Sequence, residues 1–149
     1  MIYSDMVKTA LNIAYKAHEG QMDKAGYPYI FHPYHLAEQM HTEDEVVLAL
    51  LHDVVEDTAV TIKDLRQAGV KENVLEALAL LTHAKDVPYA DYIAAIKRNK
   101  LARAVKLADL MHNCDVTRGG DSPYLAKKRE TCYYPAIEAI KKAMEEDEE

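Results

Sequence analysis

Four ionisable side chains interrupt the otherwise apolar stretch LALLHDVVEDTAV at residues 48–60. They are His52, Asp53, Glu56 and Asp57. On a continuous α-helix, with about 100° between successive residues, these four side chains share one face and the aliphatic side chains occupy the other. The polar face carries no Lys or Arg, so its three carboxylates would repel one another.

A bound divalent cation would remove the repulsion within this polar face. Adjacent His52 and Asp53 can offer one nitrogen and one oxygen ligand, a combination that suits Mn²⁺, Fe²⁺ or Zn²⁺ better than Ca²⁺. Because two protein ligands do not hold a catalytic metal, further ligands must come from elsewhere in the chain. The spacing by itself leaves a metal site and an ordinary solvated helix face both open.

Two other residues are candidates for the missing ligands. His32 lies in YPYIFHPYH, between an aromatic loop and a helix that begins near a proline. Asp109 is a lone carboxylate in the apolar run VKLADLMHN, where Lys106 and Asn113 fall on the same helical face. The alternatives are a packed or exposed loop histidine at position 32 and a buried ion pair between Asp109 and Lys106.

The elements that must position these residues are predicted to be helices. Ser4 can cap a helix that ends near residue 18, and the glycines and prolines of residues 19–33 predict a loop. Thr42 and Glu45 form a T-x-x-E capping box for the helix that carries the polar face. Thr61 can cap a short helix to about residue 68. Further helices are expected after Pro33 and over residues 71–82, 88–98, 100–117 and 123–145.

The fold class follows from these helical patterns. No segment shows the period-two alternation that is typical of strands. We therefore predict an all-α fold of about seven or eight helices, arranged as a single domain over residues 1–149. The acidic tail EEDEE at residues 145–149 is predicted to be frayed.

Composition limits the partners and the location of the protein. The net charge of −7 disfavours nucleic acid as a partner. No window approaches the roughly 18 apolar residues of a membrane span, and the first residues lack the basic start of a secretory signal. Cys114 and Cys132 form no C-x-x-C pair, and two reduced thiols are typical of a cytoplasmic protein. We expect a cytoplasmic protein without a membrane partner. The sequence does not indicate an oligomeric state.

Taken together and in order, these motifs resemble the HD-domain metal phosphohydrolases, in particular the (p)ppGpp hydrolase domain of the RelA/SpoT family and its small stand-alone relatives. The resemblance runs over residues 3–142 and rests on AHEGQMDKAGYPYIFHP, ALLHDVVEDT and LTHAKDVPYADYIAAIKRNKLARAVKLADLMHN. It implies a helical HD fold. The implied reaction is hydrolysis of the 3′-pyrophosphate of guanosine polyphosphates, which releases pyrophosphate and GDP or GTP.

The resemblance also implies roles for individual residues. The implied metal ligands are His32, His52, Asp53 and Asp109. The metal is typically Mn²⁺ in that family. Glu56 and Asp57 match the pair that orients or deprotonates the attacking water, and Asn113 matches a residue that supports the site and the sugar-phosphate region of the substrate.

The substrate contacts are less completely matched. A polyanionic nucleotide needs cations, and we expect Lys24 and Lys85 to contact its phosphates, with Lys106 as a further candidate for substrate binding. In the close relatives an Arg after the first helix packs against the guanine base, whereas this chain has Asp23 at that position. Asp23 cannot stack as a guanidinium does, although it could accept hydrogen bonds from the edge of the base.

Two other functions stay open at this stage. The chain could be a metal phosphohydrolase of another nucleotide or phosphorylated cofactor, because Asp23 puts the identity of the base in question. It could also be a non-catalytic HD module that senses a nucleotide. The presence of every implied metal ligand and of both water-activating carboxylates favours an enzyme.

Overall fold

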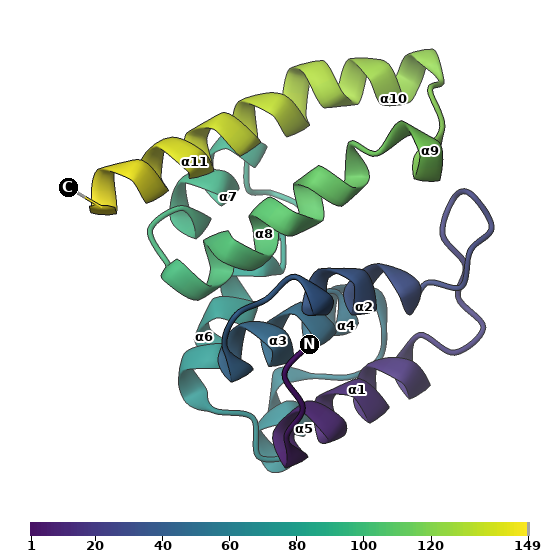
Figure 1. Cartoon of the computed structure of the whole chain (residues 1–149), viewed down its shortest axis with the longest axis vertical. Helices are drawn as coiled ribbons and strands as arrows, with labels where there is room; N and C mark the ends of the chain where they lie inside the picture. Colours follow the sequence, from purple (N-terminus) through teal and green to yellow (C-terminus); the bar gives the residue numbers. More distant parts are fainter. Residues whose placement is uncertain (149) are drawn as a thin grey trace.

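The computed structural model describes residues 1–148, which fold into a set of packed helices (Figure 1). The elements are α1 (Asp5–Ala17), α2 (Phe31–Glu38), α3 (Glu43–Leu51), α4 (Val54–Asp57), α5 (Ile62–Gln67), α6 (Glu72–Leu81), α7 (Tyr89–Ile96), α8 (Lys100–Asn113), α9 (Val116–Gly119), α10 (Pro123–Lys128), the π-helical segment η1 (Arg129–Tyr133) and α11 (Tyr134–Glu148). The described residues include no β-strand, and an isolated bridge joins Met22 to Pro28 in the loop between α1 and α2. The predicted all-α fold class is confirmed.

Helix α3 lies at the centre of the core. It packs against α1, α2, α6 and α8, and every residue from 46 to 51 is buried. The predicted aliphatic face is confirmed, but the helix is buried on its other side as well, because Val46 and Ala49 are also covered. Thr42 caps α3 by accepting a hydrogen bond from the Glu45 N–H at 3.2 Å. The segment that follows α3 is therefore anchored by the core of the molecule.

The predicted single helix through residues 48–60 is wrong, because the chain bends at His52 and Asp53. Helix α3 ends at Leu51 and α4 begins at Val54. In an uninterrupted helix the Ala49 carbonyl would accept the N–H of residue 53. Here the carbonyl accepts a hydrogen bond from His52 Nδ1 at 2.7 Å, and Asp53 adopts φ −106° and ψ −1°. The side chain of His52 thus competes with the backbone ladder at this point.

The helix predicted over residues 100–117 is also divided. Helix α8 ends at Asn113, and the short α9 begins after Asp115, whose Oδ1 accepts from the Thr117 N–H at 2.9 Å. Asp115 is thus a local N-cap that starts a new helix. The change of direction places α9 beside the loop between α1 and α2, at the right of Figure 1.

The last helix departs from the prediction in two ways. Elements α10, η1 and α11 form one long rod, with a π-helical turn just before Pro135. Pro135 has no N–H to donate to the preceding turn, and a wider turn accommodates that loss. The acidic residues 145–148 are helical rather than frayed, and Asp147 Oδ2 lies 2.7 Å from Nη1 of the buried Arg103 on α8. Residue 149 lies outside the described residues.

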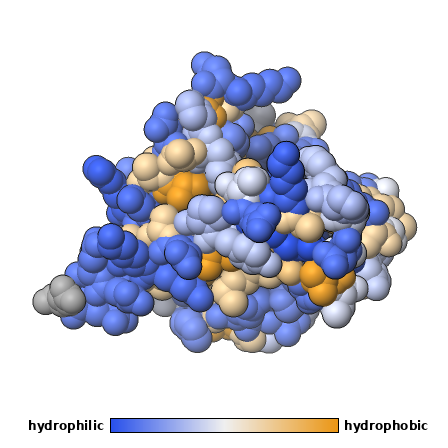
Figure 2. Space-filling view, turned by 90° about the horizontal axis from the view of Figure 1, so that it is seen from above, coloured by the Kyte–Doolittle hydropathy of each residue, from blue (hydrophilic) through white to orange (hydrophobic). Residues whose placement is uncertain are grey.

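The face that Figure 2 shows is mainly hydrophilic, and its apolar residues form small separate patches. Within residues 1–148, none of the helices combines the length and the apolar character that a membrane span requires. Cys114 and Cys132 are both free thiols, as predicted.

Candidate functional site

Three separate elements bring two histidines and an aspartate together. His32 lies in the first turn of α2, His52 follows the end of α3, and Asp109 lies on α8. One potential ligand atom of each lies within 4.8 Å of the others, and all three residues are buried. His32 Nε2 is 2.9 Å from Asp109 Oδ1, and His52 Nε2 is 3.8 Å from the same oxygen. Two imidazole nitrogens and a carboxylate oxygen in this arrangement could hold a divalent metal ion.

Asp53 lies directly beside this group. Its Oδ2 is 2.9 Å from His52 Nε2 and 3.9 Å from His32 Nε2. The structure thus brings together all four residues that the sequence predicted as metal ligands. The Tyr29 hydroxyl donates a hydrogen bond to the same Oδ2, which holds the Asp53 carboxylate in place.

The hydrogen bonding of His52 fits a metal ligand. Because its Nδ1–H donates to the Ala49 carbonyl, the neutral ring presents the lone pair of Nε2 to the two carboxylates. Among the described residues, Nε2 is buried and finds no hydrogen-bond partner of acceptable geometry. A buried polar atom without a partner is costly, and a cation at this position would remove the cost.

His32 is oriented by a second imidazole. Its Nδ1 is 2.7 Å from Nδ1 of His112, whose ring also stacks on the ring of His35, with 4.1 Å between the ring centres. Burial, followed by the charge of Arg118, lowers the pKa of His112 to about 4. The neutral His112 can therefore accept the Nδ1–H of His32, which leaves the Nε2 lone pair of His32 free for a metal. No motif in the sequence indicated this role for His112.

Opposing charges set the protonation of the group. Burial would raise the pKa of Asp109, but the charge of Lys106, followed by the hydrogen bond with His32, holds that pKa well below its usual range. Burial would lower the pKa of His52, but the Asp53 and Asp109 carboxylates raise it well above its usual value. Without a metal, a proton on His52 therefore supplies the positive charge that these carboxylates require.

Lys106 lies behind the metal-ligand group. Its Nζ is 3.0 Å from Asp109 Oδ2 and 5.2 Å from the centre of the Tyr92 ring, and its side chain is 14% exposed. The ion-pair alternative for Asp109 is therefore present in the structure together with the cluster of ligands. Since Lys106 neutralises Asp109 from this side, its position does not support direct contact with a substrate.

Glu56 faces a cavity next to the metal-ligand group. This cavity of about 30 Å³ is also lined by His52, Asp53 and Lys106, and its volume is close to that of one water molecule. Partial burial and the charge of Asp53 raise the pKa of Glu56 above its usual value. Asp57 lies on the same turn of α4 and is exposed, and partial burial and Asp53 raise its pKa too.

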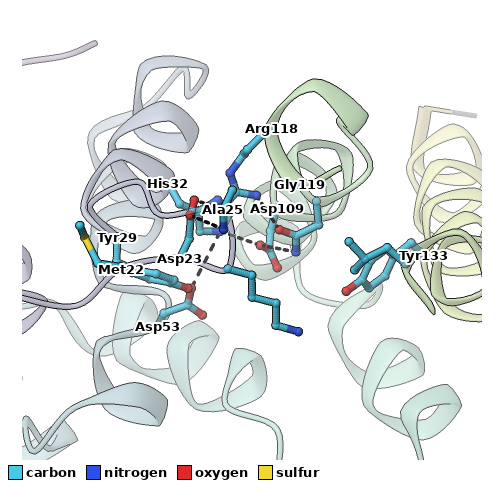
Figure 3. A pocket seen from close by; sticks show the side chains of 13 residues that line it. Met22, Asp23, Ala25, Tyr29, His32, Asp53, Asp109, Arg118, Gly119 and Tyr133 are labelled. Atoms are coloured by element: carbon cyan, nitrogen blue, oxygen red, sulfur yellow. Dashed lines mark hydrogen bonds and ion pairs between the residues drawn. The ribbon is translucent and has the colours of Figure 1, made fainter. Parts of the chain in front are cut away.

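A larger cavity opens beside the ligands (Figure 3). Its volume is about 400 Å³, and His32, Asp53 and Asp109 contribute to its wall. Asp23, Lys24 and Asn113, which the sequence predicted at the substrate, also line it. Lys85 does not lie among the residues of this wall, because it occupies the exposed connection between α6 and α7.

Tyr29 and Arg118 also line this cavity, and neither had a predicted role. Tyr29 donates to Asp53 and packs against the buried ring of His18, whose centre lies 4.8 Å from its own. Arg118 on α9 lies 3.6 Å from Asp23 and donates to Asn113. The aromatic loop and the basic residues after Asn113 were visible in the sequence. Their spacing did not show which of them would reach the cavity.

Two similar proteins carry names that describe (p)ppGpp hydrolysis. The chain is 37% identical over 157 residues to a guanosine-3′,5′-bis(diphosphate) 3′-pyrophosphohydrolase of Haemophilus influenzae, a match that covers 90% of this chain and 23% of that protein. It is 33% identical over 121 residues to the bifunctional (p)ppGpp synthase/hydrolase SpoT of Escherichia coli. This match covers 72% of this chain and 17% of SpoT. The chain thus spans about a quarter or less of these relatives. No family model matches the chain.

A solved structure shares the fold. It is described as a metazoan ortholog of SpoT that hydrolyses ppGpp, and it superposes with a TM-score of 0.76 at 22% sequence identity. The superposition covers 94% of this chain and 87% of the other. The fold that the sequence resemblance implied is therefore confirmed, and so is the resemblance itself.

Proposed function

We propose that this chain, which is homologous over 90% of its length to the guanosine-3′,5′-bis(diphosphate) 3′-pyrophosphohydrolases, is a metal-dependent hydrolase that removes the 3′-pyrophosphate of (p)ppGpp. The observation that carries this proposal is the convergence of His32, His52, Asp53 and Asp109 beside a cavity that could admit a nucleotide. We propose Mn²⁺ as the metal, because mixed imidazole and carboxylate ligands suit it. The free thiols of Cys114 and Cys132 support a cytoplasmic location.

The residues around the metal-ligand group have different roles in the proposed hydrolysis. A divalent metal held here would polarise a phosphoryl oxygen and a water molecule. Glu56 lines the water-sized cavity beside the ligands, so its carboxylate is placed to orient that water and take its proton. The raised pKa of Glu56 makes it a stronger base than an ordinary glutamate. Asp57, one residue further on α4, adds negative charge that favours proton acceptance by Glu56.

The substrate is held by groups on the cavity wall. Lys24 lines the cavity and can offer its ammonium group to the phosphates, which carry several negative charges. Asn113 donates from Nδ2 to Asp109 Oδ1 at 3.3 Å, so it fixes the ligand carboxylate and also faces the cavity. Tyr29 positions Asp53 by a hydrogen bond from its hydroxyl to the Asp53 carboxylate.

A nucleotide panel tests the proposal. Purified protein with Mn²⁺ should release pyrophosphate from ppGpp and pppGpp, and chelation of the metal should abolish the release. Orthophosphate from NADPH or a simple nucleoside monophosphate, with ppGpp untouched, would contradict the proposed substrate and favour another phosphohydrolase activity. Saturable ppGpp binding without any turnover would instead identify a nucleotide-sensing module.

A further inference from the structure

Two cavities meet at a wall formed by Asp23 and Arg118. The first is the cavity beside the metal-ligand group. The second has a volume of about 560 Å³, and Asp23, His32 and Arg118 line both. The remaining wall of the second cavity is largely aromatic and includes Tyr27, Phe31, Tyr34, His35 and His112. A ligand anchored at the metal-ligand group can therefore extend past Arg118 into an aromatic groove.

Arg118 is fixed at this wall by two partners (Figure 3). Its Nη1 donates to Asn113 Oδ1 at 3.1 Å, and its Nη2 lies 3.6 Å from Asp23 Oδ2. The Arg118 side chain is 19% exposed. These partners engage the edge of the guanidinium, and the Arg118 side chain lines both cavities.

Asp23 is not free to bind a substrate. Its Oδ1 accepts hydrogen bonds from the N–H groups of Ala25 and Tyr27, both at 2.9 Å, and its Oδ2 faces Arg118. The idea that Asp23 reads the edge of a base is therefore not supported by the structure. Its contacts make it a positioning residue for Arg118 and for the turn of the loop.

We propose that the nucleobase of the substrate lies in the aromatic groove, stacked on the guanidinium face of Arg118. This inference rests on the proposed function, since a phosphate group held at the metal-ligand cluster leaves the base to occupy the adjoining space. A guanidinium and aromatic rings both stack on bases. Tyr27 and Phe31 are 53% and 59% exposed, so their rings offer apolar surface that a base would cover. A competing reading would place the 5′-phosphates in the groove, attracted by the charge of Arg118.

The test separates stacking from charge by comparing Arg118→Ala with Arg118→Lys. Lys keeps the positive charge but has no planar face. We expect both variants to raise KM about tenfold, the effect of losing a stacking contact, while kcat, the affinity for Mn²⁺ and the melting temperature stay close to wild type. The same increase is expected for ppGpp and for guanosine 3′-diphosphate, which lacks the 5′-phosphates. Arg98→Ala is the matched control, because Arg98 is exposed and lies outside both cavity walls.

Asp23→Asn tests the positioning role. Asn retains an oxygen for the Ala25 and Tyr27 N–H groups but removes the charge that faces Arg118. We expect KM to rise in the same direction as in Arg118→Ala but by less, without a change in melting temperature. In the Arg118→Ala background, Asp23→Asn should have no further effect on KM. An equal additional increase there would show that Asp23 acts independently of Arg118.

Three outcomes overturn the stacking proposal. One is a wild-type KM for Arg118→Lys, and another is an increase in KM that is confined to ppGpp, since both would identify a phosphate contact. The third is a wild-type KM for Arg118→Ala. If wild type binds ppGpp but does not hydrolyse it, the proposed function fails while calorimetric titration of the same variants with ppGpp still reports on Arg118. Binding about tenfold weaker in both variants supports stacking, and unchanged binding rejects it.

Discussion

His52 lies between two carboxylates, Asp53 and Asp109, and this position shifts the pKa of its imidazole. Burial opposes the charge of His52, but both carboxylates raise its pKa well above the usual value, which favours a protonated ring in the metal-free protein. That proton stabilises the metal-free fold below the unfolded-state pKa, and its contribution is lost as pH rises through the folded-state pKa. A metal must displace the same proton to bind Nε2.

Binding of Mn²⁺ should therefore release about one proton near pH 6, and the affinity for Mn²⁺ should increase with pH until His52 is neutral. The release can be measured by calorimetric titration of Mn²⁺ in two buffers that differ in ionisation enthalpy. Equal apparent enthalpies in the two buffers would show that no proton leaves. His41, which is exposed and lies just before α3, provides the control: His41→Gln should leave the released proton unchanged.

Metal ligation and proton transfer should separate in single variants. Asp53→Ala removes a carboxylate next to His52 Nε2, so both Mn²⁺ binding and hydrolysis should be lost. Glu56→Gln keeps the shape of a side chain that lines the water-sized cavity but removes the base, so it should bind Mn²⁺ normally and hydrolyse ppGpp about 10²- to 10⁴-fold more slowly. Turnover by metal-free Asp53→Ala would refute the assigned ligand set. Asp86→Asn, in the exposed α6–α7 connection, is the control for loss of a carboxylate.

Only some of these residues could be predicted. His52 and Asp53 stood out because charge in an apolar run is unusual. His32 and Asp109 were candidates from their local sequence, and the resemblance to a known family assigned them as ligands. Tyr29, His112 and Arg118 act through contacts with residues distant in sequence, so no local pattern distinguished them from packing or surface residues. Lys85 stays a prediction, since it lies on the exposed α6–α7 connection and outside the wall of the cavity beside the ligands.

At the scale of the elements, local signals predicted where helices begin better than where they bend. Ser4, Thr42 and Thr61 each cap a helix as expected, because an N-cap depends on residues only two or three positions away. The bend at His52 depends on one imidazole that takes a backbone acceptor, and helical periodicity does not contain that information. The bend matters for function, because it lets consecutive residues 52 and 53 both face the same ligand group.

A cavity in α3 should destabilise the fold more than a cavity at the edge of the core. Leu48→Ala would open a cavity in a fully buried part of α3 and should lower the free energy of unfolding by about 2–5 kcal/mol. Thermal or denaturant unfolding measures this loss. Leu11→Ala on α1 is the comparison, because Leu11 is only partly buried and should cost less. Equal losses in the two variants would mean that α3 is not the centre of the core.

At the scale of the whole molecule, the candidate metal ligands connect distant parts of the chain. His32 belongs to α2, His52 and Asp53 to the bend after α3, and Asp109 to α8, so a bound ion would join segments that lie far apart in the sequence. A ligand that binds only the folded state stabilises it by about 2.7 kcal/mol at a concentration a hundred times its Kd.

For a domain of this size that gain corresponds to a rise in melting temperature of about 5–10 °C. Mn²⁺ should therefore stabilise wild type by this amount, and chelation should reverse the effect. Glu56→Gln should show the full increase although it is nearly inactive, because Glu56 lies beside the ligand group and is not one of its members. Asp53→Ala should show little or none. This pattern would tie the stabilisation to the metal-ligand cluster itself, whereas an equal increase in Asp53→Ala would locate the bound Mn²⁺ elsewhere, for instance on the acidic end of α11.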